Sequence, residues 1–136
     1  LYDENGVAAW PALAINYTTK TQFLFRINKG SHEVYDNTRI NKYVPKSERP
    51  MPFSNMVYIG DGETDIPCFR LVKEEGGHAI AVFKPRNATS KDLTQKLLEE
   101  GRANLIADYR EGSTIDSSVK AIIDRVEATA RIGGAR

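Results

Sequence analysis

The sequence predicts an α/β fold of the Rossmann-like, three-layer kind, with a mostly parallel sheet and helices on both of its faces. From residue 56 onward, short apolar runs alternate with segments of helical period, and the connections between them are short. The apolar runs lie at 56–60, 78–83 and 103–109, and they are typical of strands buried on both faces. Right-handed crossovers then bring the carboxyl ends of these strands to one edge of the sheet, where ligands bind in such folds.

Composition and charge are those of a single soluble domain. The chain has 136 residues, of which 40% are hydrophobic and 27% charged, enough for one core. Its net charge of +1 gives no electrostatic reason to expect nucleic acid or an anionic membrane as partner. No apolar run approaches the roughly 20 residues of a membrane span. Cys68 is the one cysteine of the sequence, so an internal disulfide and a cysteine metal cage are excluded. A reducing compartment fits this composition, and we expect a cytoplasmic protein.

The first 17 residues are predicted to form a hairpin arm. Asp3 to Gly6 is a turn sequence with Asn-Gly at its end, and residues 7–17 are long enough for a strand, with Pro11 at an edge or a bulge. Only Leu1 and Tyr2 precede the turn. Because two residues do not make a stable arm, we expect further structure upstream of Leu1.

Residues 18–30 are predicted to form a helix. Thr18 or Thr19 can cap its start, and Gly30 can end it. Lys20 falls in the first turn, where the helix dipole disfavours cations. The lysine is therefore either solvated or placed there for a function.

A polar insertion follows over residues 31–55, with three prolines late in the run. It shows no repeat and no strong period, so a short helix between loops is expected. A connection of this length inside a compact domain is often functional or else mobile.

Residues 56–132 are predicted to form a βαβαβα core. Its helices are expected over residues 64–77, 89–101 and 113–132. Thr64 or Asp65 can cap the first helix, and Thr89 with Asp92 has the spacing of a capping box for the second. The last residues, 133–136, should fray.

Three acids, Asp61, Glu63 and Asp65, follow the first strand of this core in a glycine-containing turn. Such acids repel one another unless a cation or the helix N-terminus compensates their charge. Magnesium suits a site of this kind, because it takes one or two carboxylates and keeps water or phosphate as its other ligands. A calcium loop is excluded, since Ile66 and Val72 stand where it needs glycine and glutamate. Alternatively, Asp65 only caps the helix while the other two acids face water.

The run "YIGDGETDIP", followed by a helix and the strand "HAIAVF", resembles the fourth motif of the haloacid dehalogenase (HAD) superfamily, in its phosphoserine-phosphatase-like branch. The resemblance covers the C-terminal half of that catalytic domain. It implies a magnesium-dependent phosphohydrolase that acts on phosphate monoesters of small molecules through an aspartyl-phosphate. It also implies that Asp61 is a direct magnesium ligand, that Asp65 supports or shares the metal site, and that Lys20 is the motif-three lysine. Lys42 and Lys46 are the alternatives for that lysine.

The chain departs from the family pattern in one important respect. The family's aspartate nucleophile lies in a D-x-D pattern, and no D-x-D occurs in these residues. The core is therefore expected to be an incomplete HAD-type core, and the chain alone is predicted to be inactive. The nucleophile strand would pair beside residues 56–60, so a missing N-terminal segment or a second chain is expected to cover that edge. The rival hypothesis is a non-catalytic α/β domain that binds a cation or serves interaction or regulation.

Overall fold

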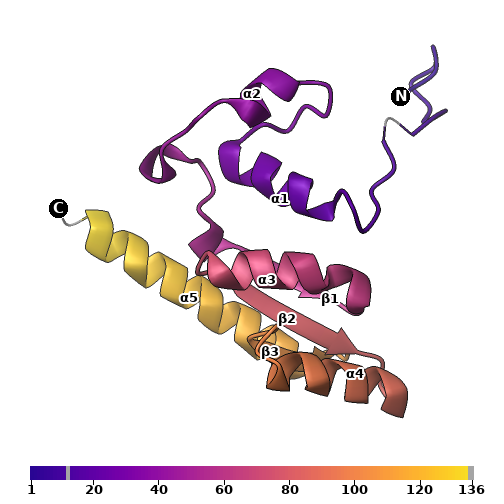
Figure 1. Ribbon diagram of the computed structural model, residues 1–136, viewed down its shortest axis with the longest axis vertical. Coiled ribbons are helices and arrows are strands. Elements are labelled where there is room, and N and C mark those ends of the chain that lie inside the picture. The colour runs from indigo at the N-terminus through magenta and orange to yellow at the C-terminus, as the bar shows by residue number, and fades with distance from the viewer. Residues whose placement is uncertain (12, 135–136) are drawn as a thin grey trace. The chain divides into compact units, whose positions relative to one another are not determined.

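The structure of the protein is a computed structural model that describes residues 1–11 and 13–134. Its helices are α1 (Lys20–Lys29), α2 (Asn37–Asn41), α3 (Ile66–Glu74), α4 (Ala88–Glu99) and α5 (Thr114–Gly134), and its strands are β1 (Val57–Gly60), β2 (His78–Phe83) and β3 (Leu105–Asp108) (Figure 1). Single 3₁₀ turns occur at η1 (Lys46–Glu48), η2 (Phe53–Asn55) and η3 (Glu63–Asp65). Among the described residues, no helix combines the length and the apolar character needed to cross a bilayer.

The chain divides into two compact units, Leu1–Pro50 and Met51–Arg136, which are described separately. The division falls inside the polar insertion predicted over residues 31–55. The single-domain organisation expected from the sequence stays a prediction.

The second unit contains a parallel three-stranded sheet in the order β1-β2-β3. Val57 is in register with His78 across the first pair, and Ile80 with Leu105 across the second. The predicted α/β class, with strands and helices alternating from residue 56 onward, is thereby confirmed. All three strands run in one direction, so Gly60, Phe83 and Asp108 end at the same edge of the sheet.

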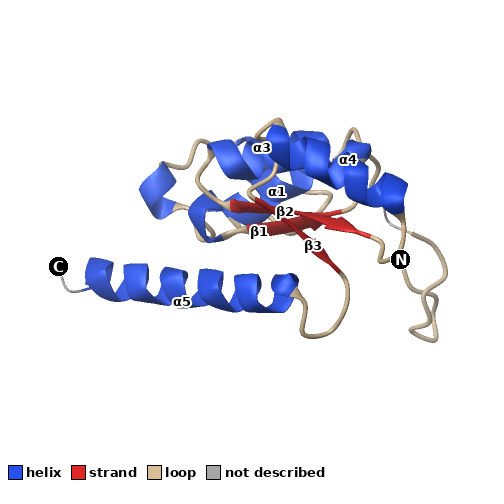
Figure 2. Ribbon diagram, turned by 90° about the horizontal axis from the view of Figure 1, so that it is seen from below, coloured by secondary structure: helices blue, strands red, loops and turns tan. Residues whose placement is uncertain are grey.

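Helices cover both faces of this sheet, as predicted. Figure 2 shows α3 and α4 on one face and α5 on the other. Alternate residues of β2 point to opposite sides, because successive side chains of a strand do so. The core on the α3 and α4 side contains Phe69, Ala79, Ala81, Leu97 and Ala103. The core on the α5 side contains Ile80, Val82, Ala107 and Ile122.

The ends of the core helices differ in detail from the prediction. Asn87, not Thr89, is the N-cap of α4, because the Asn87 side chain accepts a hydrogen bond from the Ser90 backbone N–H at 2.9 Å. Helix α5 runs to Gly134 and so extends into the segment predicted to fray. Residues 135–136 of that segment lie outside the described residues.

Strand β1 lies at an edge of the sheet. Among the described strands it pairs only with β2. Its Ile59 is on the face that α5 covers elsewhere, yet 44% of its surface is exposed. The segment or second chain expected to cover this edge stays a prediction.

In the first unit, the hairpin arm is reduced to a turn. Asp3 Oδ1 accepts hydrogen bonds from the backbone N–H groups of Asn5 and Val7, both at 2.9 Å, and Tyr2 and Ala8 form an isolated antiparallel bridge. The strand predicted over 7–17 is not present in residues 7–11 and 13–17. A strand needs a partner along its length, and in the described residues this segment pairs through the single Tyr2–Ala8 bridge.

Helix α1 confirms the predicted Lys-bearing helix, with Thr19 at its start and Gly30 in the left-handed conformation at its end. Its basic side chains hold the insertion that follows. The buried Arg26 donates to the carbonyl oxygens of Glu33 and Asp36 at 2.9 and 3.1 Å, and Lys29 donates to that of Ile40 at 2.7 Å. The short helix expected within the insertion is α2.

Candidate functional site

The turn between β1 and α3, residues 61–65, is called the acidic turn below, and a buried carboxylate organises it. Asp65 is only 5% exposed. Its Oδ2 accepts the backbone N–H of Asp61 at 3.1 Å and that of Gly62 at 3.3 Å. Its Oδ1 accepts the Tyr58 hydroxyl at 2.7 Å. Both oxygens of this carboxylate therefore fix the backbone at the end of β1.

Gly60, the last residue of β1, leaves room for this carboxylate. A Cβ atom on Gly60 would lie 2.6 Å from both Cγ and Oδ2 of Asp65, far inside van der Waals contact. Gly62 has no such neighbour within 4 Å. The first glycine of "GDG" is thus required by packing, whereas the second faces open space.

The two aspartates predicted as metal site residues have different environments. Asp61 is exposed immediately after β1, and Glu63 is also exposed. Asp65 lies inward and holds the Asp61 backbone in place. The structure therefore brings Asp61 and Asp65 into one turn, with one carboxylate facing solvent and the other supporting it.

Tyr58 is a partner of this turn that sequence reasoning missed. Burial, followed by the hydrogen bond to Asp65, raises the pKa of the Tyr58 phenol far above its usual value, so the phenol stays a donor. Its ring packs edge-on against Phe69, with the ring centroids 5.6 Å apart. The only sequence signal was its place two residues before the end of the strand, on the same face as Gly60.

Tyr109, the residue after β3, is affected by the charges of the acidic turn. Burial, and then the negative charges of Asp61 and Asp65, raise the pKa of the Tyr109 phenol. Its side chain is 53% exposed. Residues after β1 and β3 thus share one electrostatic environment at the carboxyl edge of the sheet.

The predicted lysines lie in the first unit. Lys20 begins α1, Lys42 follows α2, and Lys46 begins η1. The acidic turn belongs to the second unit. The choice among the three lysines stays a prediction.

A metal ion at the acidic turn would have few protein ligands. Within residues 1–11 and 13–134, no group of three or more His, Cys, Asp or Glu side chains could hold a metal ion. Magnesium needs only one or two carboxylates, with water or phosphate completing its shell. The exposed Asp61 carboxylate can offer such an oxygen, while the oxygens of Asp65 already accept three hydrogen bonds.

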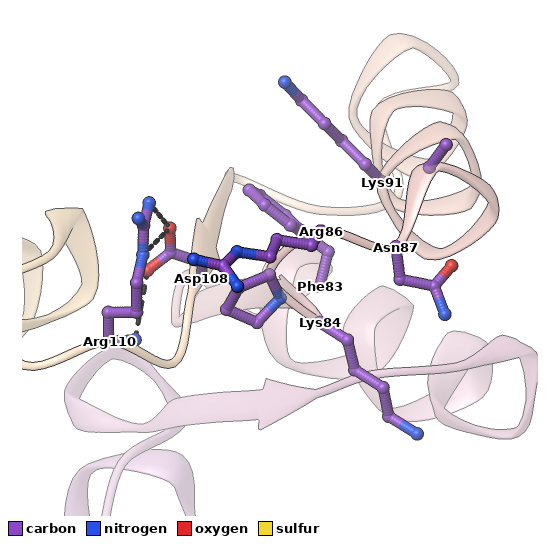
Figure 3. A pocket seen from close by; sticks show the side chains of 9 residues that line it. Phe83, Lys84, Arg86, Asn87, Lys91, Asp108 and Arg110 are labelled. Atoms are coloured by element: carbon purple, nitrogen blue, oxygen red, sulfur yellow. Dashed lines mark hydrogen bonds and ion pairs between the residues drawn. The ribbon is translucent and has the colours of Figure 1, made fainter.

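A second feature of the same sheet edge is a hollow of about 440 Å³ at the ends of β2 and β3, called the basic pocket below. Its lining is Phe83, Lys84, Pro85, Arg86, Asn87, Ala88, Lys91, Asp108 and Arg110. Figure 3 shows Arg110 bonded to Asp108, with Arg86 extending toward that pair. The Arg110 Nε donates to Asp108 Oδ2 at 2.9 Å, and this contact lowers the pKa of the Asp108 carboxyl.

One curated relative is similar to most of the chain. An uncharacterized protein of Borreliella burgdorferi is 32% identical over 116 residues, which cover 84% of this chain and 39% of that protein. The chain thus spans about two fifths of the length of the relative it matches. A comparison with protein-family models found no match, and a comparison with solved structures found none either.

Proposed function

We propose that the chain is the C-terminal part of a magnesium-dependent phosphohydrolase of the HAD type. Its substrate is a phosphorylated small molecule, and its aspartate nucleophile lies outside these 136 residues. The observation that carries the proposal is the acidic turn, in which the buried Asp65 holds an exposed Asp61 at the carboxyl end of a parallel strand. This is the edge at which ligands bind in open α/β sheets.

The residues have separate roles in this proposal. Asp61 offers a carboxylate oxygen to the metal, and Asp65 fixes the backbone from which Asp61 projects. When bound, magnesium supplies positive charge that offsets the phosphate charge. Lys20 supplies a second positive charge to the transferring group, with Lys42 and Lys46 as alternatives.

The edge of β1 supports the proposal of a further, nucleophile-bearing strand. Among the described strands, only β2 pairs with β1. Unpaired backbone groups at an edge invite a further strand. We place the strand that bears the nucleophile there, supplied by another segment of the polypeptide or by a second chain.

Metal-dependent stabilisation tests the role of Asp61. Magnesium chloride should raise the melting temperature of the wild-type chain and of Glu63→Gln, but not that of Asp61→Asn. Glu63 is the matched control because it is an exposed acid of the same turn. Equal shifts in all three proteins would refute a metal site at Asp61.

Hydrolysis of a generic phosphate monoester separates the enzyme from a non-catalytic cation-binding domain. The 136-residue chain should be inactive, whereas a longer chain extending upstream of Leu1 should be active and lose its activity in Asp61→Asn. Robust activity of the short chain would overturn the external nucleophile. An inactive longer chain that still binds magnesium would favour the non-catalytic domain.

A further inference from the structure

The basic pocket carries a concentration of positive charge that the proposed chemistry does not use. Four of its lining residues are cations, Lys84, Arg86, Lys91 and Arg110, and one is an acid. The acid, Asp108, is paired with Arg110 through a hydrogen bond from Arg110 Nε at 2.9 Å. The other three cations that line the hollow, Lys84, Arg86 and Lys91, have no carboxylate bonded to them among its lining residues.

The three remaining cations are not committed to other acids. Within the described residues, neither Lys84 nor Arg86 has an ion pair, and Lys91 lies over the Phe83 ring, 5.9 Å from its centroid. Figure 3 shows the Lys84 and Lys91 side chains extending in different directions, while Arg86 extends toward the Asp108–Arg110 pair. Arg86 and Arg110 are thus the cations best placed to share one anion.

The backbone at Arg86 is held in an unfavourable conformation. Its φ of 63° makes it the one non-glycine residue of the described chain with a positive φ. The left-handed region costs an ordinary side chain about 1–2 kcal/mol, and such costs are commonly retained where a side chain must be aimed. Glycine would adopt this positive φ without strain. The presence of arginine at this position therefore indicates that its guanidinium charge has a role.

We propose that the basic pocket binds a small molecule through a phosphate group, with Arg86 as its principal ligand and Arg110 as the second. The planar guanidinium of Arg86 can match two phosphate oxygens at once. Arg110 can add only its remaining N–H donors, because its Nε and Nη2 already donate to Asp108. The lysines raise the positive potential at the rim, which favours a dianion over chloride. The concave shape, about 440 Å³, favours a small molecule over an extended polymer.

This site is independent of the proposed phosphohydrolase chemistry. It lies at the ends of β2 and β3, and none of its lining residues belongs to the acidic turn. It needs no metal. If the basic pocket does not bind phosphate, the magnesium effect at Asp61 can still be observed. If the proposed function is wrong, phosphate can still bind to the basic pocket without magnesium.

A titration of the full 136-residue chain with inorganic phosphate, followed by amide NMR without magnesium, tests the proposal. Ionic strength is held constant with sodium chloride. Saturable shifts should concentrate on the amides of residues 84, 86–91 and 110. Shifts that do not saturate, or that spread evenly over surface lysines, would overturn the proposal.

Matched variants make the test specific. Arg86→Gly should weaken phosphate binding about tenfold, as expected for the loss of a charged hydrogen-bonding group, and its melting temperature should be no lower than that of the wild type. Lys91→Ala should weaken binding about threefold because it removes a rim charge. Lys96→Ala, on the same helix but paired with Glu100, should leave binding unchanged. Equal effects of Lys91→Ala and Lys96→Ala, or unchanged binding in Arg86→Gly, would refute the site.

Discussion

The acidic turn and the basic pocket lie at the same edge of one sheet but are built in opposite ways. In the acidic turn, the buried Asp65 accepts three hydrogen bonds and a glycine makes room for it. In the basic pocket, Lys84 and Arg86 are exposed, and the backbone at Arg86 is strained. The first is organised by interactions that stabilise the fold. In the second, the buried Asp108 supports Arg110 in a similar way, but Lys84 and Arg86 have no such support.

This difference shows where the fold can be expected to tolerate change. Substitution of Asp65 in the acidic turn removes the acceptor of three hydrogen bonds, so it should cost stability even without a ligand. Substitutions in the basic pocket remove exposed charges, so they should affect binding more than folding.

The largest expected effect is that of Asp65→Ala. It leaves the Tyr58 hydroxyl and the backbone N–H groups of Asp61 and Gly62 without their acceptor. We expect a loss of about 3 kcal/mol in the free energy of unfolding, measured by urea denaturation.

Asp61→Ala is the control for this prediction, because it removes an exposed carboxylate of the same turn. It should change the free energy of unfolding by no more than about 0.5 kcal/mol. If both variants lost the same stability, the buried carboxylate would not be what organises the turn.

Gly60→Ala should have the next largest effect. The new methyl group would lie 2.6 Å from Asp65 Cγ and would push the carboxylate away from its donors. We expect a loss of about 2 kcal/mol in the free energy of unfolding, again by urea denaturation. Gly62→Ala should be nearly neutral, because nothing lies within 4 Å of a methyl group there and its φ of −151° is open to any residue. Equal losses would contradict the close packing at Gly60.

The fold beyond residue 55 could be predicted because its signals are local and strong. The apolar runs of β1, β2 and β3 and the helical periods between them need no distant partner to be recognised. The prediction of a strand over residues 7–17 was wrong because a strand depends on a distant partner. Its sequence permits a strand, but a strand needs a partner along its length, and in the described residues this segment pairs through the single Tyr2–Ala8 bridge.

The acidic turn and the basic pocket also differ in how far the sequence could predict them. The acids of the acidic turn occur within five residues, so the sequence alone placed them together. The basic pocket combines residues that follow two different strands, Arg86 after β2 and Arg110 after β3. Only the strand order makes them neighbours. A signal was nevertheless present, because both cations come within three residues of a predicted strand end at the binding edge.

Arg86→Gly should have a smaller effect on stability than Asp65→Ala or Gly60→Ala, and with the opposite sign. Glycine accepts a φ of 63° without strain, and this gain outweighs the added freedom of the unfolded chain, so the free energy of unfolding should rise by about 0.5 kcal/mol. Lys84→Gly is the matched control. It removes the same charge from the same loop, but its φ is not positive, so glycine should lower the free energy of unfolding by about 0.5 kcal/mol. Urea denaturation of the two variants side by side measures the difference. Equal losses would mean that Arg86 is not strained, and the basic pocket would then lack the feature that sets it apart from the acidic turn.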